Sequence, residues 1–164
     1  MVVSRVLCHT MGQGIKMARV NVNKDLKWGL GKEQLVMRAV AQELTGWDEF
    51  KKLDKYDSFD YCANKDGTNC FVEIKSRRIK YGDYEETIVP ASKIAKGLEI
   101  IGKGNKVYVV ISFTDGIYYL NLANATVKFG YNARTDRGAL ELNHYAFIPL
   151  AQFKRVSKTL YTED

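Results

Sequence analysis

The segment Lys65-Asp66-Gly67-Thr68 constrains the fold of this chain more than any other feature, because it separates two strand-like runs. The runs cover residues 56–63 and 70–76. Asp-Gly between such runs is a strong signal for a tight β-hairpin, since both central residues of the turn need a positive φ angle. With Asp66 and Gly67 at the turn, the register predicts that Asp60 lies directly opposite Glu73.

This register predicts a cluster of charged side chains on one face of the hairpin. Opposed residues have Cβ atoms about 5 Å apart, and Lys75, two residues beyond Glu73, points to the same face. Two facing carboxylates, Asp60 and Glu73, repel each other unless a cation neutralises them. Their oxygen atoms suit Mg²⁺ or Mn²⁺. From the residues alone, a metal site and an ordinary solvated hairpin face remain equal alternatives.

A metal site of this composition would support hydrolysis of a phosphodiester bond. The ion would polarise a phosphate oxygen and lower the pKa of a bound water. Lys75 could orient that water or stabilise the negative charge that develops on the phosphate oxygens. If the metal-site alternative holds, the chemistry indicated is that of a metal-dependent nuclease.

A helix is predicted over residues 31–45, with glycines on both sides. At about 100° per residue, one stripe of this helix carries Val36, Met37, Val40 and Leu44. Glu33 falls in the middle of the same stripe. Because a carboxylate among apolar residues is costly without a partner, we expect Glu33 to join the charged cluster as a third carboxylate.

The remaining pattern predicts a mixed sheet. A helix over residues 90–101, with the apolar stripe Ile94, Leu98 and Ile101, joins strand 70–76 to a buried strand at 107–113. Such a connection implies a right-handed parallel crossover. A second hairpin leads to strand 117–122, and residues 145–150 and 151–158 are expected to form a strand and a helix. Residues 1–27, interrupted by Gly12 and Gly14, are expected to be irregular or two-stranded.

Composition limits the classes of protein to which the chain could belong. Its 164 residues suit a single domain over residues 1–164. The formal net charge of +6 favours a polyanionic partner such as nucleic acid. The three cysteines form no Cys-x-x-Cys pair or Cys/His cluster, so a zinc site is not expected. Without a signal peptide or an apolar run of membrane length, we expect a soluble cytoplasmic protein with no membrane partner.

The motif Val72-Glu73-Ile74-Lys75, with Phe59-Asp60 across the hairpin and a glutamate on an upstream helix, resembles the PD-(D/E)XK nuclease superfamily. The resemblance spans about residues 30–122 and is similar to a branch found in phages and large DNA viruses. The further matching residues are Arg77, Tyr81, Tyr84, Ser92-Lys93, Asp115-Gly116 and Tyr118-Tyr119. The resemblance implies an α/β, restriction-endonuclease-like fold, in which helices flank a mixed β-sheet and the core order is α-β-β-β-α-β.

The resemblance also implies roles for individual residues. Asp60 and Glu73 match the metal ligands, Lys75 matches the catalytic lysine, and the backbone carbonyl of Ile74 matches an additional ligand. Glu33 matches the helical glutamate, which is counted with both the catalytic and the metal-binding residues. Phe59 departs from the proline of the motif, at a position that varies widely in the family. The implied protein is an Mg²⁺-dependent (or Mn²⁺-dependent) endonuclease that cuts phage or viral DNA in the cytoplasm of the host cell.

Basic residues outside the motif are candidates for nucleic-acid contact. They are Arg77, Arg78, Lys93, Arg134 and Arg137. A lysine in the first turn of a helix is poorly placed for the helix dipole but well placed where a phosphate docks. Alternatives stay open: a non-catalytic nucleic-acid-binding module on the same fold, or a protein-interaction subunit. DNA versus RNA, the form of the substrate, and a monomer versus a homodimer are open as well.

Overall fold

The computed structural model describes residues 10–16, 31–44, 46–47, 49–55, 57–134, 138 and 141–156. Within these residues, the strands form a seven-stranded sheet in the order β1-β2-β3-β4-β6-β7-β10 and a three-stranded sheet in the order β5-β9-β8. The larger sheet contains β1 (Thr10–Lys16), β2 (Glu49–Leu53), β3 (Tyr61–Lys65), β4 (Thr68–Ser76), β6 (Lys106–Phe113), β7 (Gly116–Asn121) and β10 (Lys154–Arg155). The smaller sheet contains β5 (Glu86–Pro90), β8 (Lys128–Arg134) and β9 (Glu141–Pro149).

The predicted hairpin is formed by β3 and β4. Asp66 and Gly67 have φ angles of 51° and 83°, the two positive values that the tight turn requires. The ladder runs in the predicted register from Lys65↔Thr68 to Tyr61↔Val72. β3 begins at Tyr61, so the predicted strand over residues 56–63 starts too early.

The core follows the predicted order. It runs through α2 (Lys32–Ala41), β2, β3, β4, α3 (Ala91–Gly102) and β6, and β5 is inserted before α3. β4 and β6 pair in parallel, with Glu73 beside Val109, so the helix over residues 90–101 joins parallel strands as expected. The predicted fold class is thereby confirmed: helices flank a mixed sheet.

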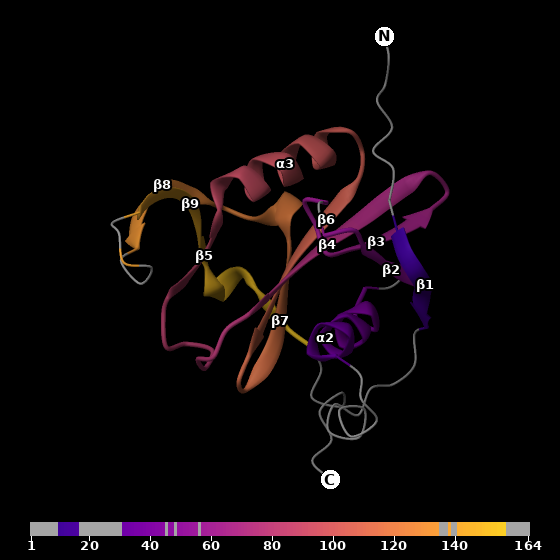
Figure 1. The fold of residues 1–164 in the computed structure, drawn as a ribbon, viewed down its shortest axis with the longest axis horizontal. Coiled ribbons are helices and arrows are strands. Elements are labelled where there is room, and N and C mark those ends of the chain that lie inside the picture. The colour runs from indigo at the N-terminus through magenta and orange to yellow at the C-terminus, as the bar shows by residue number, and fades with distance from the viewer. Residues whose placement is uncertain are drawn as a thin grey trace.

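The two helices cover opposite faces of the large sheet (Figure 1). Val36, Met37, Val40 and Leu44 are all buried in the core on the α2 side, as the helical periodicity predicts. α3 packs on the other face through Ile94 and Ile100. The helix over residues 31–45 is shorter than predicted, since α2 ends at Ala41.

The apolar stripe predicted for α3 is partly wrong. Leu98 is 48% exposed, whereas Gly97 is buried. A Cβ atom at Gly97 would lie 2.7 Å from Leu122 Cδ2, so the absence of a side chain allows α3 to pack closely on the segment after β7. Gly97 therefore faces the core of the sheet, and Leu98 faces outward.

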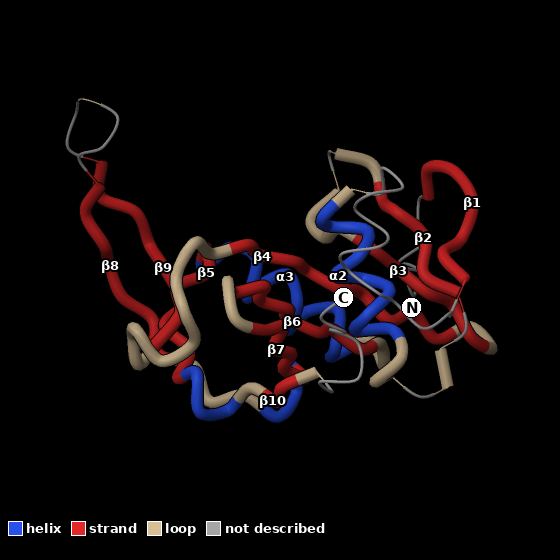
Figure 2. Tube along the Cα trace, turned by 90° about the horizontal axis from the view of Figure 1, so that it is seen from below, coloured by secondary structure: helices blue, strands red, loops and turns tan. Residues whose placement is uncertain are grey.

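The last part of the chain differs most from the prediction. Residues 151–158 were expected to be helical, but the described part holds a 3₁₀ turn, Leu150–Gln152, and then β10. The strand predicted at 145–150 lies mostly within β9, whose neighbour β8 was not predicted. β8 and β9 extend beyond the rest of the molecule as a two-stranded arm (Figure 2).

The first part of the chain is also only partly predicted. Gly12 and Gly14 do not interrupt β1 but lie inside it, where the pairing with β2 is irregular between Met11 and Ile15. The alternative strands 2–7 and 19–23 lie outside the described residues. Among the helices of the described part, none has the length and apolar character needed to cross a membrane.

Candidate active site

Asp60 lies where the β3–β4 ladder becomes irregular. Tyr61 pairs with Val72, and the backbone N–H of Asp60 donates to the same Val72 carbonyl at 3.0 Å. Two residues of one strand therefore oppose one residue of the other, which is the pattern of a β-bulge. The prediction that Asp60 stands directly opposite Glu73 is wrong in this detail, because the bulge shifts the register by one residue.

The bulge nevertheless directs the Asp60 side chain toward the β4 motif. Asp60 Oδ2 accepts a hydrogen bond of 2.7 Å from the backbone N–H of Ile74, the residue after Glu73. The Asp60 side chain is 25% exposed. One carboxylate oxygen thus serves as acceptor for β4, and the other, Oδ1, lies 4.0 Å from Lys52 Nζ.

Glu73 is a buried carboxylate held by two lysines. Its side chain is only 2% exposed. Lys93 Nζ, from the first turn of α3, lies 2.7 Å from both carboxylate oxygens, and Lys75 Nζ lies 3.0 Å from Oε1. A charge buried to this extent requires such partners.

Opposing effects act on the protonation of Glu73. Burial raises its pKa most strongly and the charge of Asp60 raises it further, while the hydrogen bond from Lys93 and the charge of Lys75 lower it. The result is a pKa above the usual value for a glutamate. The charge of Asp60 thus disfavours the ionised form of Glu73, as expected for two neighbouring carboxylates.

Glu33 does not join the two carboxylates directly. It lies in the first turn of α2 and forms an ion pair with Lys52 of β2. Its side chain is 44% exposed, so the prediction that it faces the core is wrong: Glu33 is the second residue of α2, and the buried part of the helix begins only at Leu35. Among the described residues, no group of three or more His, Cys, Asp and Glu side chains is arranged to hold a metal ion.

Lys52 connects Glu33 with Asp60. Its Nζ lies 4.0 Å from Asp60 Oδ1 and 5.0 Å from the centre of the Tyr61 ring. Because β2 pairs Lys52 with Tyr61, the sheet itself places this ammonium group at the site. Sequence reasoning missed Lys52, since the short segment Glu49–Leu53 carries no hairpin signal that would have marked it as a strand.

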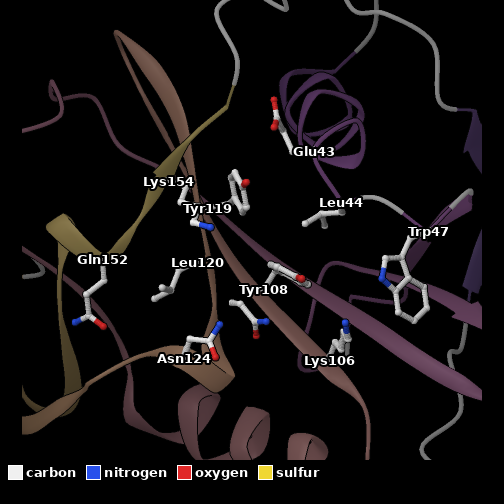
Figure 3. A pocket seen from close by; sticks show the side chains of 11 residues that line it. Glu43, Leu44, Trp47, Lys106, Tyr108, Tyr119, Leu120, Asn124, Gln152 and Lys154 are labelled. Atoms are coloured by element: carbon white, nitrogen blue, oxygen red, sulfur yellow. The ribbon is translucent and has the colours of Figure 1, made fainter.

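Asp60, Lys52 and Lys93 line an open cleft. The cleft has a volume of about 680 Å³, and its other lining residues are Leu53 and residues of the segment between β2 and β3. A second pocket of about 480 Å³ is lined by residues such as Trp47, Tyr108 and Tyr119 (Figure 3). The second pocket shares no residue with the carboxylate cluster, so the first cleft is the candidate substrate site.

Comparison with known proteins identifies the family. Residues 30–156 match the model of a family described as phage putative PDDEXK endonuclease. The chain belongs to this endonuclease family. No curated protein matches the sequence. Among solved structures, the chain is similar to Hjc of Archaeoglobus fulgidus, a Holliday junction resolvase from an archaeal hyperthermophile, with 13% identity and a TM-score of 0.47 over 82% of this chain and 100% of that chain.

The match confirms the resemblance inferred from the motif. It covers Glu33, Asp60, Glu73 and Lys75. It also extends past residue 122, the expected end of the core, and includes the β8–β9 arm and β10. The family model therefore also matches segments of this chain beyond the motif.

The basic residues predicted to contact nucleic acid do not form one described group in the structure. Arg77 donates from Nη2 to the carbonyl of Ile88 at 3.2 Å, which ties the end of β4 to β5. Arg78 is exposed, and the ammonium group of Lys93 contacts Glu73. The Arg134 side chain and all of Arg137 lie outside the described part of the endonuclease.

Proposed function

We propose that this chain is an Mg²⁺-dependent endonuclease that hydrolyses phosphodiester bonds in DNA. The observation that carries the proposal is the buried carboxylate of Glu73, which lies 3.0 Å from Lys75 Nζ. The next residue, Ile74, donates its backbone N–H to the carboxylate of Asp60. Membership of the phage endonuclease family supports the reaction. We further propose that the chain acts on phage or viral DNA in the cytoplasm of a host cell.

The residues present fit a hard divalent cation. Asp60 and Glu73 offer carboxylate oxygens, which Mg²⁺ and Mn²⁺ prefer, and the pKa of Glu73 is raised in part by its neighbour. We propose that these two residues hold the ion, with the Ile74 carbonyl as an additional ligand. Glu33 would contribute a further carboxylate, directly or through a water, once its ion pair with Lys52 opens.

The chemistry divides between the ion and the side chains. A bound divalent cation supplies a Lewis acid that polarises the phosphate and lowers the pKa of a water. Lys75, held in place by Glu73, orients the attacking water or stabilises charge that develops on the phosphate oxygens. Lys52 draws the anionic backbone toward Asp60 across the open cleft.

We propose that DNA binds through basic side chains. Lys93 lines the cleft, Arg77 and Arg78 follow the catalytic strand β4, and Arg134 and Arg137 stay candidates from the sequence alone, since their side chains lie outside the described residues. Contacts of this kind to phosphates give affinity without sequence specificity. The formal charge of +6 agrees with such binding, which weakens as salt concentration rises.

A cleavage assay tests this function. We expect the purified protein to cut branched or plasmid DNA with Mg²⁺, and we expect EDTA to stop the reaction. Lys75→Ala should lower cleavage by at least about 100-fold while DNA binding persists, because removing a group that stabilises the transition state typically costs that much. Lys103→Ala, at the far end of α3 beside Glu99, is the matched control and should retain activity.

Two results would contradict the proposal. Salt-sensitive DNA binding without cleavage under any divalent ion would indicate a non-catalytic nucleic-acid-binding module. Full activity in Lys75→Ala would remove this lysine from the mechanism.

A further inference from the structure

Lys93 holds Glu73 in the manner of a bound cation. Its ammonium group lies 2.7 Å from Oε1 and 2.7 Å from Oε2, so it contacts both oxygens of the carboxylate. These are the same oxygens that a divalent ion on Glu73 would need. Lys93 therefore takes up lone pairs on both oxygens, and its positive charge disfavours a divalent ion on the same carboxylate.

The position of Lys93 in α3 indicates that its ion pair with Glu73 holds the ammonium group at this site. Lys93 lies in the first turn of α3 (Ala91–Gly102), where the helix dipole disfavours a positive charge. Within the described residues, its ammonium group makes its polar contacts with Glu73. Attraction to one carboxylate thus outweighs an unfavourable helix position.

Of the two partners, Lys93 is the one that can move. Glu73 is 2% exposed and fixed inside β4, between β3 and β6. The Lys93 side chain is 27% exposed and lines the open cleft beside Asp60. A lysine has a flexible four-carbon stem, so its charged end can swing into the cleft without moving α3.

We propose that Lys93 is an exchangeable internal counter-ion: it occupies Glu73 in the ion-free protein and is displaced into the cleft when a divalent cation binds. The inference rests on the proposed function in taking Glu73 as a ligand of that ion. It assigns Lys93 a role in metal affinity that is separate from any contact with DNA.

The charges around the site give this exchange a consequence. Lys52, Lys75 and Lys93 balance the carboxylates of Glu33, Asp60 and Glu73. A divalent cation adds positive charge to a balanced cluster, so one ammonium group must leave the carboxylates for the ion to bind well. The ion-free site is therefore stable but binds metal weakly, and removing Lys93 should strengthen metal binding.

Mn²⁺ binding without DNA tests the proposal. The dissociation constant of Mn²⁺ would be measured by electron paramagnetic resonance for the wild type, Lys93→Met and Lys96→Met. Methionine keeps the apolar stem and removes the charge. Lys96 lies on the same helix, pairs only with exposed Glu99 in the contacts described, and serves as the control.

We expect Lys93→Met to bind Mn²⁺ at least about tenfold more tightly, since hydrogen bonds between charged groups typically contribute enough to account for such a factor. Lys96→Met should match the wild type. Equal or weaker binding by a folded Lys93→Met would overturn the proposal, because Lys93 would then support the site or be indifferent to it.

A second measurement uses the wild type and does not depend on a variant folding. Acetylation of each lysine by an amine-reactive reagent would be followed by mass spectrometry, with and without Mn²⁺. We expect the modification rate of Lys93 to rise several-fold with Mn²⁺ while that of Lys96 stays constant. A Lys93 rate that does not rise with saturating Mn²⁺ contradicts displacement.

The two tests separate this inference from the proposed function. Metal-dependent cleavage by the wild type, with unchanged Mn²⁺ affinity in Lys93→Met, would support the nuclease function and contradict the counter-ion role of Lys93. Tighter Mn²⁺ binding by Lys93→Met, without cleavage of any DNA by the wild type, would support the counter-ion role and contradict the nuclease function.

Discussion

Replacing Gly97 by alanine tests the close packing that places α3, and with it Lys93, over Glu73. The new Cβ atom would lie 2.7 Å from Leu122 Cδ2, 3.5 Å from Val107 Cγ1 and 3.6 Å from Phe59 Cζ. Leu122 is 2% exposed, Val107 0% and Phe59 5%. Because these neighbours are themselves packed, they cannot withdraw without disturbing the core on this face of the sheet.

The size of the effect follows from two opposing contributions. Overpacking a core by one carbon typically costs about 1–3 kcal/mol. Alanine in place of glycine favours the helix by about 1 kcal/mol. We therefore expect Gly97→Ala to lower the free energy of unfolding by about 1 kcal/mol, which corresponds to a fall in Tm of about 2–4 °C for a chain of this size.

Thermal and urea unfolding, followed by circular dichroism, would measure this change. Gly102→Ala is the matched control on the same helix, since a Cβ atom there would meet nothing within 4 Å. The control should be neutral or more stable by up to about 1 kcal/mol. A Gly97→Ala protein as stable as this control would refute the close approach of α3 to the sheet.

Substitutions at two further residues, Asp60 and Glu73, separate structural from chemical roles at the site. Asp60→Ala should cost about 1–3 kcal/mol of stability because the Ile74 N–H loses its acceptor, while Asp60→Asn keeps an acceptor; urea unfolding should show this difference, and cleavage should be lost in both. Burial raises the pKa of Glu73, so the native carboxyl binds a proton more tightly than the unfolded chain does. Wild-type stability relative to Glu73→Gln should therefore rise as pH falls from neutral toward 4.5, the usual value; a difference in urea-unfolding free energy that is flat or falls on acidification would contradict the raised pKa.

Local turn chemistry made the hairpin predictable. Asp66-Gly67 determined the register from Lys65 to Tyr61, because few other residue pairs accept two positive φ angles. The bulge at Asp60 was not predictable from this rule. It depends on a hydrogen bond between a side chain and the backbone of the neighbouring strand, which a pairing register does not contain.

Tertiary placement explains the other differences. The periodicity of α3 favoured Leu98 as a core residue, but the close approach at Gly97 turned Leu98 outward. The partner of Lys93 depends on where the crossover places α3 over β4, which the sequence does not determine. The sequence suggested a phosphate as the partner of Lys93, whereas in the structure its partner is Glu73. β8 was missed because its glycine and mixed polar residues give little strand signal without its partner β9.

A crystal of the protein soaked in Mn²⁺, with anomalous diffraction recorded at the manganese edge, tests the proposed metal site most directly. We expect a peak within coordination distance of carboxylate oxygens from both Asp60 and Glu73, with the Lys93 ammonium group moved away from Glu73. An unchanged Lys93–Glu73 contact with no peak beside these carboxylates at saturating Mn²⁺ would contradict the metal-dependent mechanism.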